Sequence, residues 1–139
     1  MKFVEYPEVD GPEIRPSILR CPFSPCNARI IASDNLSQVK VHNSPSLVNV
    51  LKDQVHDVFY MINDVWDFDN IGVLRPATDI QQPTIDGEES NLDIKIERLL
   101  ICSECDKGPL GFAGFEGDET DVKKLKYFLS CKSVLYQLQ

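Results

Sequence analysis

Basic residues are scarce in this chain. It has 14 lysines and arginines against 22 aspartates and glutamates, so its formal net charge is −8. Nucleic-acid affinity comes largely from basic side chains that neutralise phosphates, so this balance argues against a nucleic-acid partner. The small basic run at residues 123–126 is interpreted as a solvated face. The same charge disfavours an anionic membrane surface and favours a protein partner with a basic patch.

A long hydrophobic run is also lacking. No window reaches the roughly 18 apolar residues of a membrane span, so we expect no direct membrane insertion. The first twenty residues mix acids and prolines where a signal peptide needs an apolar run. We therefore expect a cytoplasmic protein, whose thiols stay reduced. In that compartment the five cysteines indicate metal binding or reactive thiols before disulfides.

The length of 139 residues suits one domain. Prolines at every fourth or fifth position predict an irregular arm over residues 1–19. We assign residues 20–139 to a single compact β domain of short antiparallel strands divided by turns. Two prolines, a glycine and clustered acids predict a flexible surface loop near residues 75–91.

Strands are predicted from β-branched, aromatic and alternating residues at 28–32, 57–62 and 92–101. Alternation over residues 65–73 predicts another strand, with Trp66 and Phe68 on one face and a bulge at Gly72. Residues 36–50 suggest strands or a loop, and residues 126–138 one strand or two.

Four of the cysteines form two closely spaced pairs. Cys21 and Cys26 have the spacing C-x4-C, and Cys102 and Cys105 have the spacing C-x2-C. Each spacing puts two thiolates on one tight turn, which supplies two corners of a tetrahedron. We predict one structural Zn²⁺ bound by all four, a closed site without an open position for water. The alternative is two pairs of thiols without metal.

The fifth cysteine, Cys131, lies in an apolar stretch and is interpreted as a buried structural residue. An enzyme is the alternative: methionine-R-sulfoxide reductases combine a four-cysteine zinc site with a late nucleophilic cysteine, and Cys131 is the only candidate here. His42 and His56 have no ligand-like neighbours in the sequence and are interpreted as surface or structural histidines.

Two sequence blocks resemble the Mss/Dss suppressor-of-sec family. They are DVWDFDNIGV at residues 64–73 and LICSECDKGPLG at residues 100–111. The similarity extends from Cys21 to about Phe112 and is weak over residues 30–60. Members of that family are small zinc proteins that bind Rab GTPases and release their nucleotide.

The resemblance implies a compact, Mss-like (β-tent) fold in which both cysteine pairs meet at one zinc. It implies a factor that prefers nucleotide-free Rab proteins of the secretory pathway, releases GDP slowly and resembles a chaperone for the empty GTPase. Such a factor is not an enzyme, is expected to be monomeric when free, and reaches secretory membranes through its GTPase. The binding residues carried over by the resemblance are Asp64, Val65, Trp66, Asp67, Phe68, Asp69 and Asn70.

Trp66 is the only tryptophan and follows a polar turn. Aromatic side chains are frequent anchors at the centre of protein interfaces, and flanking acids can steer them toward a basic partner. Large aromatic residues also fill cores, so Trp66 and Phe68 can be read instead as the buried face of a strand.

Overall fold

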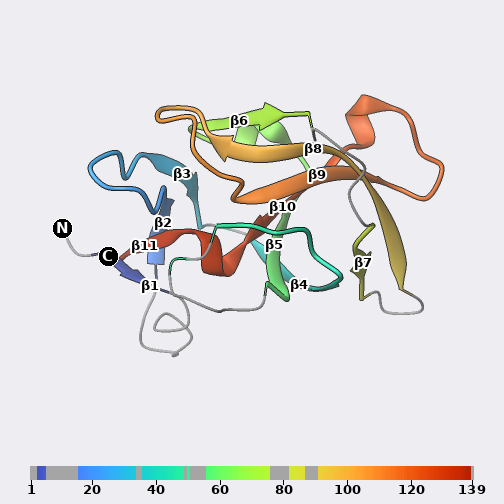
Figure 1. Ribbon diagram of the computed structural model, residues 1–139, viewed down its shortest axis with the longest axis horizontal. Helices are drawn as coiled ribbons and strands as arrows, with labels where there is room; N and C mark the ends of the chain where they lie inside the picture. Colours follow the sequence, from blue (N-terminus) through green and yellow to red (C-terminus); the bar gives the residue numbers. More distant parts are fainter. Residues whose placement is uncertain are drawn as a thin grey trace.

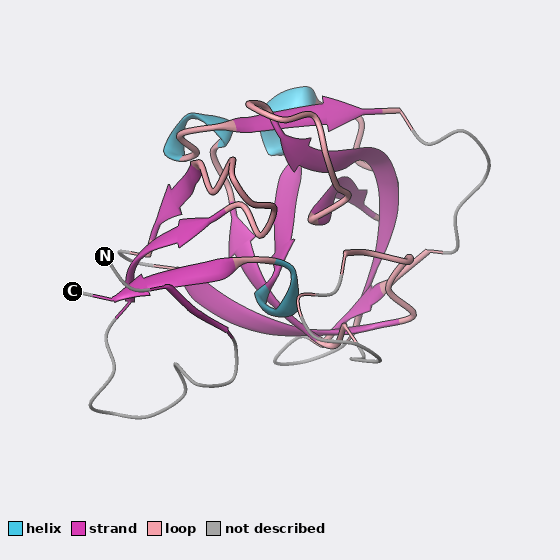
Figure 2. Cartoon of the chain, turned by 60° about the vertical axis from the view of Figure 1, so that its left-hand side comes forward, coloured by secondary structure: helices cyan, strands magenta, loops and turns pink. Residues whose placement is uncertain are grey.

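The computed structural model describes residues 3–5, 16–33, 36–48, 50, 56–75, 82–86 and 91–138. In these ranges the chain is mainly β, with three single-turn 3-10 helices and no α-helix (Figures 1 and 2). No helix in this part of the chain is long and apolar enough to cross a membrane.

The strands form two antiparallel sheets. The smaller sheet has four strands in the order β1 (Phe3–Glu5), β11 (Leu135–Leu138), β2 (Pro16–Arg20) and β3 (Arg29–Ala32). The larger sheet has the order β6 (Ile71–Leu74), β8 (Leu92–Cys102), β7 (Thr84–Ile85), β4 (Ser37–His42), β5 (Val58–Ile62), β10 (Lys126–Ser130) and β9 (Gly111–Glu116).

The long strand β8 closes the larger sheet into a barrel. Its start pairs with β7, and residues from Ile94 to Leu100 pair with β9. The last strand in the order, β9, thus returns to β8 and closes the ring. The register shifts between Ile96 and Arg98, and such an irregularity bends a strand. Strand β6 then pairs with the last four residues of β8, Leu99 to Cys102, outside the closed ring.

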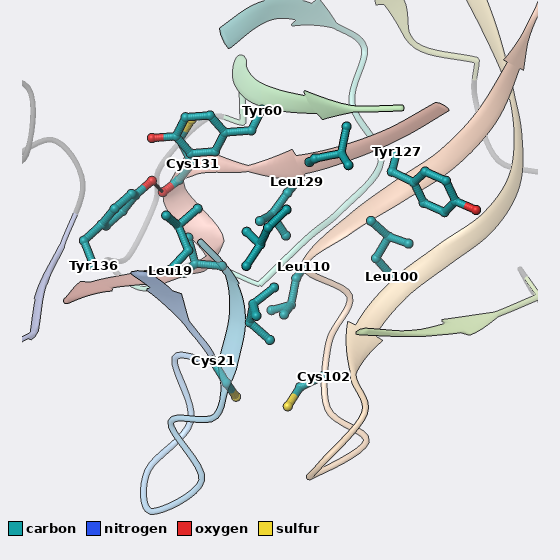
Figure 3. Close-up of a cluster of buried hydrophobic side chains, with 14 of the residues drawn as sticks. Leu19, Cys21, Tyr60, Leu100, Cys102, Leu110, Tyr127, Leu129, Cys131 and Tyr136 are labelled. Carbon is teal, nitrogen blue, oxygen red and sulfur yellow. Dashed lines mark hydrogen bonds between the residues drawn. The ribbon is translucent and has the colours of Figure 1, made fainter. Parts of the chain in front are cut away.

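Side chains alternate along the barrel strands between two cores. On β10, the Phe128 side chain packs inside the barrel with Phe59 and Phe112. The Tyr127 and Leu129 side chains point the other way, into a second cluster of buried side chains. The ring centroids of Phe112 and Phe128 are 5.1 Å apart. The second cluster includes Leu19 and Tyr136 of the smaller sheet, and the side chains of Cys21 and Cys102 extend from its edge (Figure 3). This second cluster is therefore a core that the two sheets share, and the paired cysteines lie at its border.

Several predicted strands are confirmed. Those at residues 28–32, 57–62 and 92–101 correspond to β3, β5 and β8. Residues 126–138 form two strands, β10 and β11, joined by the 3-10 helix η3 (Cys131–Ser133).

The irregular arm predicted over residues 1–19 is wrong for two segments, because β1 and the first four residues of β2 lie within it. Pro16 is the first residue of β2, a strand position at which proline is tolerated. Within the loop predicted near residues 75–91, Thr84 and Ile85 form β7, while residues 76–81 and 87–90 lie outside the described part.

The continuous strand predicted over residues 65–73 is also wrong. Val65–Asp67 is a 3-10 helix, η1, because the Asp64 carboxylate accepts a hydrogen bond from the Trp66 N–H and fixes a turn there. The predicted bulge at Gly72 is absent, since the β6–β8 register runs without a shift. A Cβ at Gly72 would lie 3.2 Å from the Ile101 side chain, so this glycine permits a close approach of the two strands.

Candidate functional site

Two turns with the same backbone pattern present the four paired cysteines. The N–H of Cys21 donates to the Ala28 carbonyl at 2.9 Å, and the N–H of Cys102 donates to the Lys107 carbonyl at 3.0 Å. In each turn the first cysteine thus bonds to the residue two places after the second. The residues that follow the second cysteines have positive φ: 41° at Asn27 and 60° at Asp106. Both are types that tolerate this left-handed conformation, so the local sequence suits the turns.

The four sulfur atoms converge. The Sγ atoms of Cys21, Cys26, Cys102 and Cys105 all lie within 4.8 Å of one another. Across the two turns, Cys21 Sγ is 3.7 Å from Cys105 Sγ, and Cys26 Sγ is 3.8 Å from Cys102 Sγ. These distances are too long for a disulfide, in which the sulfurs are about 2.05 Å apart.

The same distances fit a tetrahedral metal. With a zinc–sulfur bond of about 2.3 Å, the edge of a regular tetrahedron of sulfurs is about 3.8 Å. Both cross-turn distances match that edge. The cluster could therefore hold one metal ion, and four thiolates are a donor set typical of structural zinc.

Burial favours neutral thiols at Cys21 and Cys102 when no cation is bound. Burial raises the pKa of the Cys21 and Cys102 thiols, and the neighbouring cysteines raise both further. A bound dication reverses this preference, because thiolates ligate the metal and are stabilised by its charge. A metal ion would thus offset the cost of burying the Cys21 and Cys102 sulfurs.

Trp66 is the most exposed large apolar side chain among the described residues. It is 87% exposed and lies in the middle of η1. Its N–H donates to the Asp64 carboxylate at 2.9 Å, so the turn that carries the indole is fixed by a side chain. The interpretation of Trp66 as a core residue is therefore wrong.

The neighbours of Trp66 divide into exposed and anchoring residues. Asp64 and Asp67 are exposed, whereas Val65 and Phe68 are partly buried and pack against the shared core. The Phe68 ring meets Tyr127 edge-on, with centroids 5.9 Å apart. For Phe68 the core interpretation thus accounts for the contacts seen.

The segment continues along strand β3, the edge of the smaller sheet. Phe68 forms an isolated bridge with Ile31, and the Asp69 N–H donates to the Ile30 carbonyl at 2.8 Å. The Asp69 carboxylate lies 3.2 Å from Arg29 Nε, and the Asn70 amide donates to the Arg29 carbonyl at 3.0 Å. Asp69 and Asn70 thus hold the segment that carries Trp66.

A groove of about 600 Å³ is lined by residues of both cysteine turns together with Arg29 and Asn70. Phe23, Arg29, Asn70 and Lys107 are among its lining residues, and the Lys107 ammonium lies 5.2 Å from the Phe23 ring centroid. Sequence reasoning missed Phe23, Arg29 and Lys107 as groove residues. The sequence feature that could have indicated this role is the position of these residues close to the paired cysteines.

Cys131 and the two histidines lie apart from the cysteine cluster. Cys131 is fully buried, and burial raises the pKa of its thiol to about 12. A reactive cysteine needs an accessible thiol of lowered pKa, so Cys131 does not suit the reductase alternative. His42 pairs with Asp86 at 2.7 Å, and His56 Nδ1 lies 2.5 Å from Ser130 Oγ, which places both in structural contacts.

The fold and the site together define a small β protein with a four-cysteine cluster that could hold a metal ion. The family model described as Mss4 protein matches residues 17–136. A relative from Saccharomyces cerevisiae (strain ATCC 204508 / S288c), Protein DSS4, is 30% identical over 132 residues, covering 82% of this chain and 92% of the relative. The chain belongs to the Mss4 family.

Proposed function

We propose that this chain binds the nucleotide-free form of a Rab-type small GTPase of the secretory pathway and promotes slow release of its GDP. Membership of the Mss4 family supports a role directed at such a GTPase. The observation that carries the proposal is the exposure of Trp66 on a capped turn. An ordered, exposed indole offers a large apolar contact at little cost in conformational entropy, as an interface anchor requires.

Acidic groups beside Trp66 suit an emptied nucleotide site. Asp64 and Asp67 are exposed, and the net charge of the chain is −8. A GTPase that has lost its nucleotide presents basic groups and backbone N–H donors that had bound phosphate. Opposite charges would speed the encounter of the two proteins and disfavour partners that carry an acidic surface.

Nucleotide release follows from binding alone. A factor that binds the empty GTPase more tightly than the loaded one lowers the affinity of the GTPase for nucleotide by the same factor. The chain then acts by stabilising the open state, both as a release factor and as a chaperone of the empty form. No general acid, base or nucleophile of this chain is required, so the proposal describes a regulator and not an enzyme.

We assign one zinc ion to Cys21, Cys26, Cys102 and Cys105, with a structural role. The first turn leads into β3, and Cys102 is the last residue of β8, the strand that pairs with β6. Residues 68–74 run along both, first against β3 and then as β6. A metal that joins the two turns would therefore fix both supports of the segment that carries Trp66.

The proposal also covers the domain organisation, oligomeric state and cellular location of the protein. Residues 20–139, together with the strands that precede them, act as one zinc-stabilised unit that is monomeric when free and cytoplasmic. It binds no nucleic acid, inserts in no membrane, and reaches secretory membranes through the bound GTPase.

The test is a binding panel. Purified Rab proteins, each stripped of nucleotide or loaded with GDP or GTP, are presented to the immobilised chain, with a small GTPase of another subfamily as control. We expect capture of at least one empty Rab and little capture of the loaded forms. Equal capture of the empty and loaded forms, or no capture of any Rab, would contradict the proposal.

A further inference from the structure

The four sulfurs of the cysteine cluster differ in their access to solvent. Cys21 and Cys102 are fully buried and belong to the core that the two sheets share. Cys26 and Cys105 are only partly buried, and both line the groove of about 600 Å³. Each turn therefore has one covered sulfur and one that a small molecule can reach from solvent.

The groove suits a small oxidant. A water molecule occupies about 30 Å³, and a hydroperoxide is only slightly larger. Lys107 and Arg29 line the groove, against one acidic residue, Glu104. Arg29 is paired with Asp69, whereas the Lys107 ammonium lies over the Phe23 ring. Reactive cysteines typically have such electropositive, partly exposed surroundings, where a positive charge stabilises the anion that leaves when sulfur is oxidised.

Each partly exposed sulfur lies beside a buried one on the opposite turn. Cys105 Sγ is 3.7 Å from Cys21 Sγ, and Cys26 Sγ is 3.8 Å from Cys102 Sγ. The sulfurs of a disulfide are about 2.05 Å apart, so each pair has to close by about 1.7 Å. Redox-sensitive cysteines are accessible and often stand next to a second cysteine that resolves the oxidised sulfur. The cluster holds two such pairs.

We propose that the cluster is a site of reversible oxidation, at which Cys26 and Cys105 react with a hydroperoxide and their buried neighbours then complete disulfides across the two turns. This inference goes beyond the proposed function and does not depend on the GTPase. It rests on the metal assignment, because the reacting sulfurs are taken to be zinc thiolates. Such sulfurs are deprotonated, and the thiolate is the nucleophilic form of cysteine.

The reaction has two steps. In the first, the thiolate of Cys26 or Cys105 donates an electron pair to one peroxide oxygen, the O–O bond breaks and hydroxide leaves, so that the sulfur becomes a sulfenic acid. In the second, the buried thiolate attacks that sulfur, the S–S bond forms, the S–O bond breaks and a second hydroxide leaves. Both hydroxides take protons from solvent and become water. Each disulfide thus removes two electrons from the protein, reduces one hydrogen peroxide and takes two ligands from the metal.

The disulfides would replace the metal as the link between the two turns. They join residues 84 and 76 positions apart, so they restrict the unfolded chain over long loops. The fold should therefore survive the loss of zinc by oxidation, whereas a chelator that removes zinc from the reduced protein leaves the turns unlinked. A dithiol reductant with added Zn²⁺ should restore the starting state.

The test uses the full chain loaded with zinc, whose metal content is measured first. Hydrogen peroxide is added with a coloured zinc indicator and a probe that traps sulfenic acids, and the modified peptides are identified by mass spectrometry. We expect the probe on Cys26 and Cys105, with zinc released as thiols are lost. Cys131 is the internal control, because it is fully buried outside the cluster and should remain a thiol.

A second sample is oxidised without the probe. We expect one disulfide between Cys21 and Cys105 and another between Cys26 and Cys102. The oxidised protein should keep its melting transition in the presence of a chelator. Treatment with a dithiol and Zn²⁺ should return four thiols to the cluster and one zinc to the chain.

Lys107→Gln tests the role of the groove without changing a metal ligand. The substitution removes the ammonium and leaves the Lys107 carbonyl, which accepts from the Cys102 N–H. Exposed charges interact modestly, so zinc release by peroxide should slow about twofold to fivefold. Lys123→Gln is the matched control, since Lys123 is an exposed lysine of the 3-10 helix η2 (Val122–Lys124) that does not line this groove. Its rate should equal that of the unmodified chain.

Several results would overturn the inference. They are the probe on Cys21 or Cys102 before the other two cysteines, disulfides within one turn or between chains, loss of the melting transition as zinc leaves, and equal rates in Lys107→Gln and Lys123→Gln. A purified chain without zinc would contradict the metal assignment and the inference together. Failure to capture any empty Rab, with the expected oxidation products present, would contradict the proposed function alone.

Discussion

The carboxylate of Asp64 accepts a hydrogen bond from the backbone N–H of Trp66 at 2.9 Å. This bond caps the 3-10 turn η1, so it fixes the direction in which the exposed indole projects. Asp64→Ala removes the cap, which typically costs about 1 kcal/mol of local stability. We expect faster dissociation of the empty Rab from this variant.

Asp64→Asn separates the cap from the charge, because the amide oxygen still accepts the bond. Its dissociation rate should match that of the unmodified chain, while its association slows and depends less on salt. Stopped-flow association and dissociation rates at two ionic strengths measure both. Identical dissociation rates for Asp64→Ala and the unmodified chain would show that the cap does not matter for binding.

Trp66→Ala is the direct test of the anchor. A central aromatic contact contributes about 2 kcal/mol or more to an interface, so the variant should bind the empty Rab about thirtyfold more weakly. GDP release from the Rab should slow accordingly, while zinc content and melting temperature stay unchanged because the indole is exposed.

Val122→Ala provides the matched control for Trp66→Ala. Val122 is exposed on η2 (Val122–Lys124), a second 3-10 turn capped by an aspartate, Asp121. It shares exposure and local structure with Trp66 but lies elsewhere in the sequence, so its truncation should leave binding intact. Equal losses in both variants would indicate a nonspecific effect of apolar surface.

Several strands and the cysteine cluster were predictable from local patterns. Period-2 alternation marked β8, and two short cysteine spacings marked a cluster whose members lie 76 and 84 residues apart in the chain. Both patterns involve only residues that are close together in the sequence, so they can be recognised without knowledge of the tertiary structure.

The turn at Trp66 was not predictable in this way. Alternation of aromatic and acidic residues over 65–69 is what a strand would show, yet a single bond from the Asp64 side chain replaces the strand by η1. The roles of Arg29 and Asn70 depend on β3 lying beside residues 68–70, a contact some 40 residues apart in sequence. No local pattern encodes such a pairing.

Cys102→Ser tests the metal assignment. Loss of one of four thiolates should lower zinc content and solubility together, because binding and folding are coupled at such sites. A chelator should unfold the unmodified protein for the same reason. Cys131→Ser is the control: its sulfur lies in the core near Tyr136 and outside the cluster, so it should fold and keep one zinc per chain. Full zinc retention in Cys102→Ser, by metal analysis, would contradict the assignment.

Gly111→Ala tests the close packing of the barrel. Gly111 lies on β9 between β8 and β10, and a Cβ there would overlap the Phe128 carbonyl oxygen, a backbone atom that cannot move alone. Overpacking of this kind costs about 1–3 kcal/mol, so the midpoint of denaturant unfolding should fall clearly. Gly117→Asn is the control, since Gly117 has φ 55° with open space around it, and asparagine tolerates that conformation. An unchanged midpoint for Gly111→Ala would show that β9 can shift.

His56 makes the stability of the fold depend on pH. Its Nδ1 lies 2.5 Å from Ser130 Oγ, and its Nε2 is buried without a hydrogen-bond partner in the described structure. Burial lowers the pKa of His56 below its usual value, and the ammonium of Lys132 lowers it further, while the Leu47 carbonyl and Asp57 act in the opposite direction. The neutral ring is therefore the form that the folded protein favours.

The direction of the pH effect follows from this lowered pKa. As pH falls below about 6.5, the unfolded chain takes up a proton at His56 before the folded chain does, so folding stability declines until the pH has passed the lower folded pKa. His56→Asn keeps a polar atom near the Ser130 hydroxyl but cannot titrate. Melting temperatures of both proteins at pH 7.5, 6.5 and 5.5, with zinc content checked at each pH, measure the difference. The unmodified protein should lose more stability than the variant between pH 6.5 and 5.5, and parallel curves would assign the acid sensitivity to other groups.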